Sequence, residues 1–223
     1  MTQARLLTLL LAFAGGSFAA QAQTQSQTAA PASPAVQSKV AGCIGCHGIK
    51  GFQASFPEIH KVPMISGQGA AYTIAALNAY KKGERKHPTM RSVAGVLSEQ
   101  DMADVAAYYE QHGKSAATLP AQPPAAPPAV AALLTKGACA SCHGANYSAP
   151  IDGSYPKLAG QHADYLYEAL KSYQTVGNAK VGRSNAIMVG QVKQFSHAEL
   201  KLMANYLASL PSDLQTLPQS KFR

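Results

Sequence analysis

The sequence predicts an all-α protein made of two similar helical domains in tandem. Apolar residues recur at helical spacing in both halves, no stretch shows the alternation of a half-buried strand, and the second half repeats the pattern of the first. A segment rich in proline and alanine separates the halves and favours an extended connector. We therefore expect a first domain over 35–113, a linker over 114–129 and a second domain over 130–223.

The start of the chain has the pattern of a secretory signal peptide. Arg5 precedes a short apolar run, small residues follow, and Ala20-Gln21-Ala22 forms an A-x-A cleavage site that assigns 1–22 to the signal. The run is far shorter than the roughly 20 residues of a membrane span, and no later segment is long and apolar enough. We therefore expect export to the periplasm and a mature chain without a span, with an uncleaved anchor as the alternative. Residues 23–34 are mainly Gln, Ala, Ser, Thr and Pro, and we expect disorder there because such a composition cannot bury a core.

The same helices are expected in the same order in each half. A short helix precedes each cysteine motif, at about 35–41 and 130–135. A second helix follows from the apolar patterns of 72–80 and 165–173. A last helix follows a serine of the type that favours N-caps, and its apolar positions are spaced i, i+3, i+4, i+7. These residues are Ser98 with Met102, Val105, Ala106 and Tyr109, and Ser196 with Leu200, Met203, Ala204 and Leu207.

All four cysteines lie in two copies of one motif. Residues 43–47 read Cys-Ile-Gly-Cys-His and residues 139–143 read Cys-Ala-Ser-Cys-His. This C-x-x-C-H spacing is the attachment signal of c-type haem, because two thiols can add to the vinyl groups of one porphyrin while the histidine reaches the iron. Zinc binding and dithiol redox chemistry are the alternatives. The long separation of the two pairs argues against zinc, and the lack of a βαβ pattern argues against a dithiol oxidoreductase. The predicted residues for two covalent haem c groups are Cys43, Cys46, Cys139 and Cys142, with His47 and His143 on the irons.

The internal repeat also selects a second iron ligand in each half. Methionine and histidine are the candidates for that position. Only Met90 and Met188 occupy the same place in both halves. His87, which aligns with Asn185, is the main alternative in the first domain. Other methionines align with residues of a different type in the opposite half, namely Met64, Met102 and Met203.

Each half resembles a class I cytochrome c domain, a small helical fold around a covalent haem. The shared features are C-x-x-C-H near the start, a P-x-(L/I)-x-G element, a later methionine and a final helix. The tandem arrangement, with Gly-Gln in the proline element of both halves and Met after Gly-x-Arg in the first half, resembles the dihaem cytochrome c4 family over 36–210.

The resemblance implies further contacts around each haem. The proline would present its carbonyl to the Nδ1–H of the proximal histidine, and the residue two positions later would pack on the porphyrin. The arginine before the methionine would pair with haem propionates, because guanidinium matches carboxylate geometry, with a solvated surface arginine as the alternative. These residues are Pro63, Ile65 and Arg85 in the first half and Pro156, Leu158 and Arg183 in the second.

The formal net charge is +8; Arg5 of the expected signal peptide contributes one charge, and the remaining +7 is spread over both domains. The first has nine basic and six acidic residues, counting Lys114, and the second has nine and five. There is no dense basic run and no nucleic-acid motif, so we expect no nucleic-acid binding. We interpret the charge as a source of solubility and of steering toward an acidic redox partner.

Ligation by histidine and methionine fills both axial positions of an iron and is typical of an electron carrier. We find no other catalytic constellation and expect no enzyme activity. The resemblance implies donors such as a quinol–cytochrome c reductase or a periplasmic dehydrogenase, and acceptors such as a membrane terminal oxidase. The alternatives are the cytochrome subunit of a periplasmic dehydrogenase complex and a two-haem peroxidase, which needs one open iron.

Overall fold

The computed structural model describes residues 33–114 and 118–218. The expected signal peptide and residues 23–32 of the expected disordered segment lie outside the described residues. Residue 34 of that segment is helical: Ser33 is the N-cap of the first helix and its side chain accepts the N–H of Val36. Among the described residues, no helix is long and apolar enough to cross a membrane.

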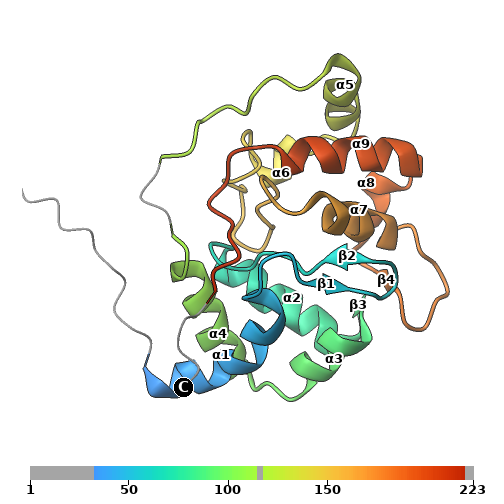
Figure 1. The fold of residues 1–223 in the computed structure, drawn as a ribbon. Coiled ribbons are helices and arrows are strands. Elements are labelled where there is room, and N and C mark those ends of the chain that lie inside the picture. The colour runs from blue at the N-terminus through green and yellow to red at the C-terminus, as the bar shows by residue number, and fades with distance from the viewer. Residues whose placement is uncertain (1–32, 115–117, 219–223) are drawn as a thin grey trace, which may run out of the picture.

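The described chain is mainly helical, and its helices form two groups joined by a linker (Figure 1). The first group contains α1 (Pro34–His47), α2 (Ala70–Lys82), α3 (Pro88–Gly95) and α4 (Glu99–Gln111). The second contains α5 (Pro128–Lys136), α6 (Ala140–His143), α7 (Ala163–Ser172), α8 (Ala186–Val192) and α9 (His197–Ala208). The predicted all-α tandem is therefore confirmed.

The final helices, α4 and α9, begin as the sequence predicts. Ser98 and Ser196 are both N-caps, and each forms a capping box with the acidic residue three positions later. The predicted apolar positions are buried, with Met102 at 1% exposure and Leu200 at 0%. Helix α4 packs on α1 and α2, whereas α9 packs on α5 and α7, so each final helix forms the centre of its own domain.

The helices around the two cysteine motifs differ. Helix α1 continues through the first motif to His47, farther than predicted. In the second domain α5 begins two residues before the predicted start, ends at Lys136, and is followed by the separate turn α6. Ala138 between them has a φ of 46°, a left-handed conformation that interrupts a helix.

In the described part of the chain, four strands of two residues each were not predicted, because they are too short to show an alternating pattern. Strands β1 (Gln53–Ala54) and β2 (His60–Lys61) pair within the first domain. Strands β3 (Arg85–Lys86) and β4 (Gly182–Arg183) pair antiparallel between the domains. The ladder places Arg85 directly opposite Arg183. The equivalent segments of the repeat therefore meet at the domain interface.

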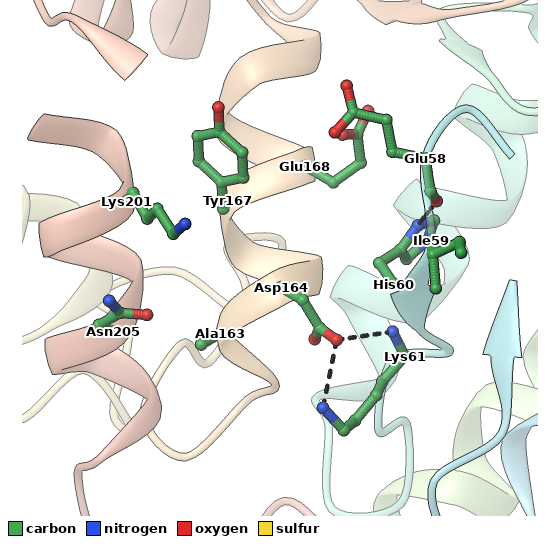
Figure 2. A pocket seen from close by; sticks show the side chains of 10 residues that line it. All are labelled: Glu58, Ile59, His60, Lys61, Ala163, Asp164, Tyr167, Glu168, Lys201 and Asn205. Carbon is green, nitrogen blue, oxygen red and sulfur yellow. Dashed lines mark hydrogen bonds and ion pairs between the residues drawn. The ribbon is translucent and has the colours of Figure 1, made fainter. Parts of the chain in front are cut away.

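Other contacts join the two domains. Figure 2 shows Lys61 of β2 beside a pocket, where its backbone N–H and its ammonium both reach Asp164 of α7, at 3.0 and 3.2 Å. The segment after α9 returns to the first domain (Figure 1). There the N–H of Gln215 donates to the carbonyl of Ser66 (3.0 Å), and its side-chain amide donates to Gly113 (3.1 Å).

The linker contacts the second domain. Residues 118–127 contain no helix or strand. The Tyr206 hydroxyl donates to the carbonyl of Pro124 (2.8 Å), and the Asn146 amide donates to Pro120 (3.0 Å). The two domains are thus held together by direct contacts as well as by the connection between them.

Candidate haem sites

Each motif histidine is held by the proline carbonyl that the family resemblance implies. The Nδ1–H of His47 donates to the carbonyl of Pro63 at 2.8 Å, and that of His143 donates to Pro156 at 3.0 Å. Because a carbonyl oxygen only accepts, Nδ1 carries the proton and Nε2 keeps its lone pair. This is the tautomer that a metal-binding histidine needs.

Burial favours the neutral form of both rings. It lowers the pKa of His47 and His143 below the ordinary histidine value, although the hydrogen bonds to the proline carbonyls oppose this. The rings are therefore neutral near pH 7, and Nε2 is available for iron without prior loss of a proton.

The four cysteines all lie within the described residues, and none is in a disulfide. Each is half-buried. Burial raises the pKa of the Cys43 and Cys139 thiols. Ile65 packs against the same apolar cluster as Cys43, and Leu158 packs against the cluster that Cys139 contacts. The predicted porphyrin-packing residues thus lie in the same cores as the attachment cysteines.

The two candidate methionines have the same local structure. Met90 and Met188 are each the third residue of a short helix, α3 or α8. The backbone N–H of Met90 donates to Nδ1 of His87 (3.3 Å), and that of Met188 donates to Oδ1 of Asn185 (3.1 Å). His87 and Asn185, which align in the repeat, thus have the same role as helix N-caps.

The other methionines have different surroundings. Met102 and Met203 are 1% and 3% exposed and belong to the buried faces of α4 and α9. Met64 lies at the domain interface, where its backbone is hydrogen-bonded to Gln161. The sequence ranked all three below Met90 and Met188 by the repeat, and ranked Met102 and Met203 lower also because they lie on the apolar face of a final helix.

The two arginines named from the resemblance meet at the domain interface. The guanidinium of Arg85 lies over the rings of Tyr72 and Tyr80, 5.2 and 5.7 Å from their centroids, and donates to the Tyr72 hydroxyl (3.1 Å). Arg183 has the same arrangement in the other domain. Its partners are Tyr165 at 5.7 Å, with a hydrogen bond of 3.2 Å to the hydroxyl, and Tyr173 at 5.5 Å.

This cluster has two cations and no matching anions. Within the described residues, neither guanidinium has a carboxylate partner. Burial raises the pKa of Tyr72 to about 12. Burial is also the largest effect on Tyr165, but the charges of Arg183 and Arg85 and the hydrogen bond from Arg183 together outweigh it and lower the pKa of that hydroxyl. The cluster therefore suits a pair of anionic groups. Together with the free cysteines and neutral histidines, it fits a haem whose propionates reach the interface.

Two kinds of residue at this interface were not predicted from the sequence. Tyr72 and Tyr165 appeared there only as apolar positions of helices, although they align in the repeat. Gln68 and Gln161 appeared only as part of a family motif, yet both are 4% exposed and bond across the interface. The tyrosines and the glutamines each recur at the same position in both halves, and this recurrence was the sequence feature that could have identified them.

Comparison with known proteins gives first the class and then the family. The cytochrome c family model matches residues 35–112 and 129–211. The chain is therefore a tandem c-type cytochrome. Cytochrome c4 of Stutzerimonas stutzeri is 31% identical over 194 residues, which cover 78% of this chain and 87% of that protein. The chain belongs to the cytochrome c4 family, carries two covalently bound haem c groups and is an electron carrier.

Two further comparisons bear on the structure and the partners. The crystal structure of reduced recombinant cytochrome c4 from Pseudomonas stutzeri aligns with a TM-score of 0.57 at 29% identity, over 82% of this chain and 100% of that one. A thiosulfate dehydrogenase electron acceptor of Stutzerimonas stutzeri strain A1501 is 28% identical over 178 residues, covering 75% of this chain and 78% of that protein.

Proposed function

We propose that this chain is a periplasmic carrier of electrons between respiratory-chain components, and not an enzyme, with each iron held between a histidine and a methionine. The observation that carries the proposal is the repeated local structure. In both domains a carbonyl fixes the Nδ1–H of the motif histidine, and an N-cap fixes the helix turn that bears the methionine. The proposed ligands are His47 and Met90 in the first domain and His143 and Met188 in the second.

The protein groups in this arrangement hold the metal rather than react. When bound, the haem supplies one-electron chemistry, and the chain supplies ligands, orientation and burial. If His47 and Met90 hold one iron and His143 and Met188 hold the other, these residues would leave no position open for a substrate. The carbonyl and the N-cap hold both ligands in place, so their geometry need change little between oxidation states.

We also propose that Arg85 and Arg183 bind the haem propionates. Their rigid stacking on tyrosine rings and their lack of a carboxylate partner among the described residues support this role. Because β3 and β4 place the two arginines opposite each other, the propionates of both haems would meet at the interface. Close approach of the two groups favours electron exchange within the molecule.

The proposed donors are a quinol–cytochrome c reductase or a periplasmic dehydrogenase, and the proposed acceptor is a membrane terminal oxidase. The net charge of +7 that remains after removal of Arg5 supports association with acidic surfaces of such partners. Reduction and oxidation by purified partners should therefore slow as ionic strength rises. Fractionation of cells should recover the chain in the periplasm with its N-terminus after Ala22.

The name of one relative favours a second candidate function. The thiosulfate dehydrogenase electron acceptor covers most of this chain. A protein of this kind would accept electrons from one periplasmic dehydrogenase as its bound subunit. Stable co-purification with a dehydrogenase would favour that function, and isolation as a free protein reduced by several donors would favour the general carrier.

The far-red absorbance of the oxidised protein tests the ligands. Methionine sulfur on ferric haem gives a weak charge-transfer band there. We expect Met90→Ala and Met188→Ala each to remove about half of the band and to open one iron to small ligands. Met64→Ala is the matched control and should leave the band intact, because Met64 aligns with Lys157 in the second half, and the substitution keeps the backbone contacts with Gln161.

His87→Asn distinguishes between Met90 and His87 as the second iron ligand in the first domain. Asparagine is the residue that caps the equivalent helix in the second domain, so the substitution keeps the cap while it removes the imidazole. An unchanged spectrum supports Met90. Loss of the native spectrum in His87→Asn, or a high-spin spectrum with peroxide turnover in the wild type, would contradict the proposal.

A further inference from the structure

Two buried glutamines bind across the domain interface in a reciprocal arrangement. Oε1 of Gln161 accepts the N–H of Met64 (3.0 Å), and Nε2 donates to the carbonyl of Met64 (2.9 Å). Gln68 makes the same two bonds to Lys157, at 3.0 and 3.1 Å. Both glutamines are 4% exposed, so these bonds are shielded from water.

Each contact reaches the peptide group that holds a haem-site histidine. The carbonyl of Pro63 and the N–H of Met64 belong to one planar peptide group. That group accepts from His47 on one side and donates to Gln161 of the other domain. The result is a hydrogen-bond chain from the ring of His47, through a single peptide, to the opposite domain.

The second haem site has the same chain in the opposite direction. The carbonyl of Pro156 accepts from His143 at 3.0 Å, and the N–H of Lys157 in the same peptide donates to Gln68 at 3.0 Å. Each glutamine oxygen also accepts the N–H of the next residue, Gly69 or His162, which fixes the amide orientation. Oxygen is therefore the atom that faces the opposite peptide N–H.

Hydrogen bonds in such a chain polarise one another. An acceptor on the peptide N–H makes the carbonyl oxygen a better acceptor, and a better acceptor draws the Nδ1 proton away from the imidazole ring. The ring then donates more electron density at Nε2, which favours the oxidised iron and lowers its reduction potential. The strength of the glutamine contact should thus set part of the potential of the haem in the other domain.

We propose that Gln161 is a positioning residue for His47 and that Gln68 is a positioning residue for His143, each acting across the domain interface. The docking of the two domains thereby tunes both iron sites. This inference rests on the proposed ligand assignment, and it predicts a crossed pattern: a substitution in one domain changes the potential of the haem in the other.

The test is a potentiometric titration of the full-length holoprotein with Gln161→Met or Gln68→Met. Methionine is unbranched and of similar length, and it removes both hydrogen bonds. We expect Gln161→Met to raise the potential of the haem at His47, and Gln68→Met to raise that of the haem at His143, each with little change at the other site. In the Gln161 variant the NMR resonance of the His47 Nδ1–H should also shift.

Gln215→Met is the matched control. Its side-chain amide also crosses between domains, to the carbonyl of Gly113, but that carbonyl does not belong to a peptide bound to either histidine. The control should leave both potentials and the His47 resonance unchanged. Lys61 with Asp164, and the pairing of β3 with β4, remain in every variant and keep the domains docked.

The two haems are distinguished by Met90→His and Met188→His, each of which should lower one potential. If Met90→His moves neither potential, the ligand assignment fails. If Met90→His moves one potential but Gln161→Met moves the other, or moves both equally, the inference is overturned. The inference is also overturned if the control Gln215→Met shifts the potentials as Gln161→Met does. If Gln161→Met does not fold, Gln161→Asn replaces it. Asparagine is polar but too short to reach Met64, so we again expect the potential of the haem at His47 to rise.

Discussion

Gly144, directly after the second haem-site histidine, should not tolerate a side chain. Its backbone has φ of 81° and ψ of 157°, a region used almost only by glycine. A Cβ built there would lie 2.0 Å from the carbonyl oxygen of Ala149 and 2.7 Å from the carbonyl carbon. Both are backbone atoms, so no rotation of a side chain can relieve the overlap.

The cost of Gly144→Ala follows from two contributions. Holding a non-glycine residue in this region costs about 1–3 kcal/mol. Moving the loop away from the new methyl group breaks the hydrogen bond from the N–H of Ile151 to the carbonyl of Cys142 (3.1 Å), worth about 1 kcal/mol. We expect the free energy of unfolding to fall by about 2–4 kcal/mol.

Gly48, which follows the first motif, is the matched control. Its φ is −95°, which any residue can adopt, and its nearest contact would be Cγ2 of the Ile44 side chain at 2.7 Å. The Ile44 carbonyl oxygen would lie 3.0 Å away, and the buried, β-branched Ile44 side chain must adjust, but the overlap with backbone is far smaller than at Gly144, so Gly48→Ala should cost less than Gly144→Ala. The difference between the two variants tests the conformational argument rather than a general sensitivity of the motifs.

The assay is guanidinium unfolding of both holoproteins, followed by circular dichroism and by haem absorbance. A shift of the midpoint at constant slope gives the change in stability. The reasoning would be refuted if Gly144→Ala stayed within about 0.5 kcal/mol of the wild type, or if Gly48→Ala were the more damaging change.

Three further predictions concern the stability of the helices around the haem sites. Ser196→Ala should lower the free energy of unfolding by about 1 kcal/mol because it removes the cap of α9. Leu200→Ala should lower it by about 2–5 kcal/mol because it opens a cavity at a fully buried position. Thermal unfolding of the holoprotein checks both. Lys39 holds the pKa of Asp101 and Asp104 below the ordinary aspartate value. This pairing stabilises the fold at neutral pH and is lost as pH falls through that value, so Lys39→Met should weaken the loss of stability between about pH 5 and pH 2, measured as unfolding midpoints.

Local chemistry explains which elements the sequence could predict. The final helices followed from a serine cap and an apolar face, both of which act within a few residues. The haem motif could be recognised in the sequence because covalent attachment fixes the spacing of two cysteines and a histidine. Helices α3 and α8 were missed because 8 and 7 residues hold too few turns to show a periodic face.

The domain interface depends on information that local patterns lack. A Pro/Ala-rich linker is compatible with many relative orientations of two domains. Gln68 and Gln161 follow glycine turns and look like exposed loop residues until the opposite domain covers them. Arg85 and Arg183 were ambiguous for the same reason, since only the pairing of β3 with β4 shows that they face each other.

The reciprocal glutamine contact has the form of an isologous homodimer interface, in which one surface carries both halves of the same contact. A single-domain ancestor with this surface would have paired with its own copy at sufficient concentration. When two copies are joined in one chain, the linker keeps each domain near the other at an effective concentration in the millimolar range, so pairing no longer depends on the protein concentration. Because each glutamine recognises only backbone atoms, the side chain at the recognised position is free to diverge after duplication, and here it is methionine at 64 and lysine at 157.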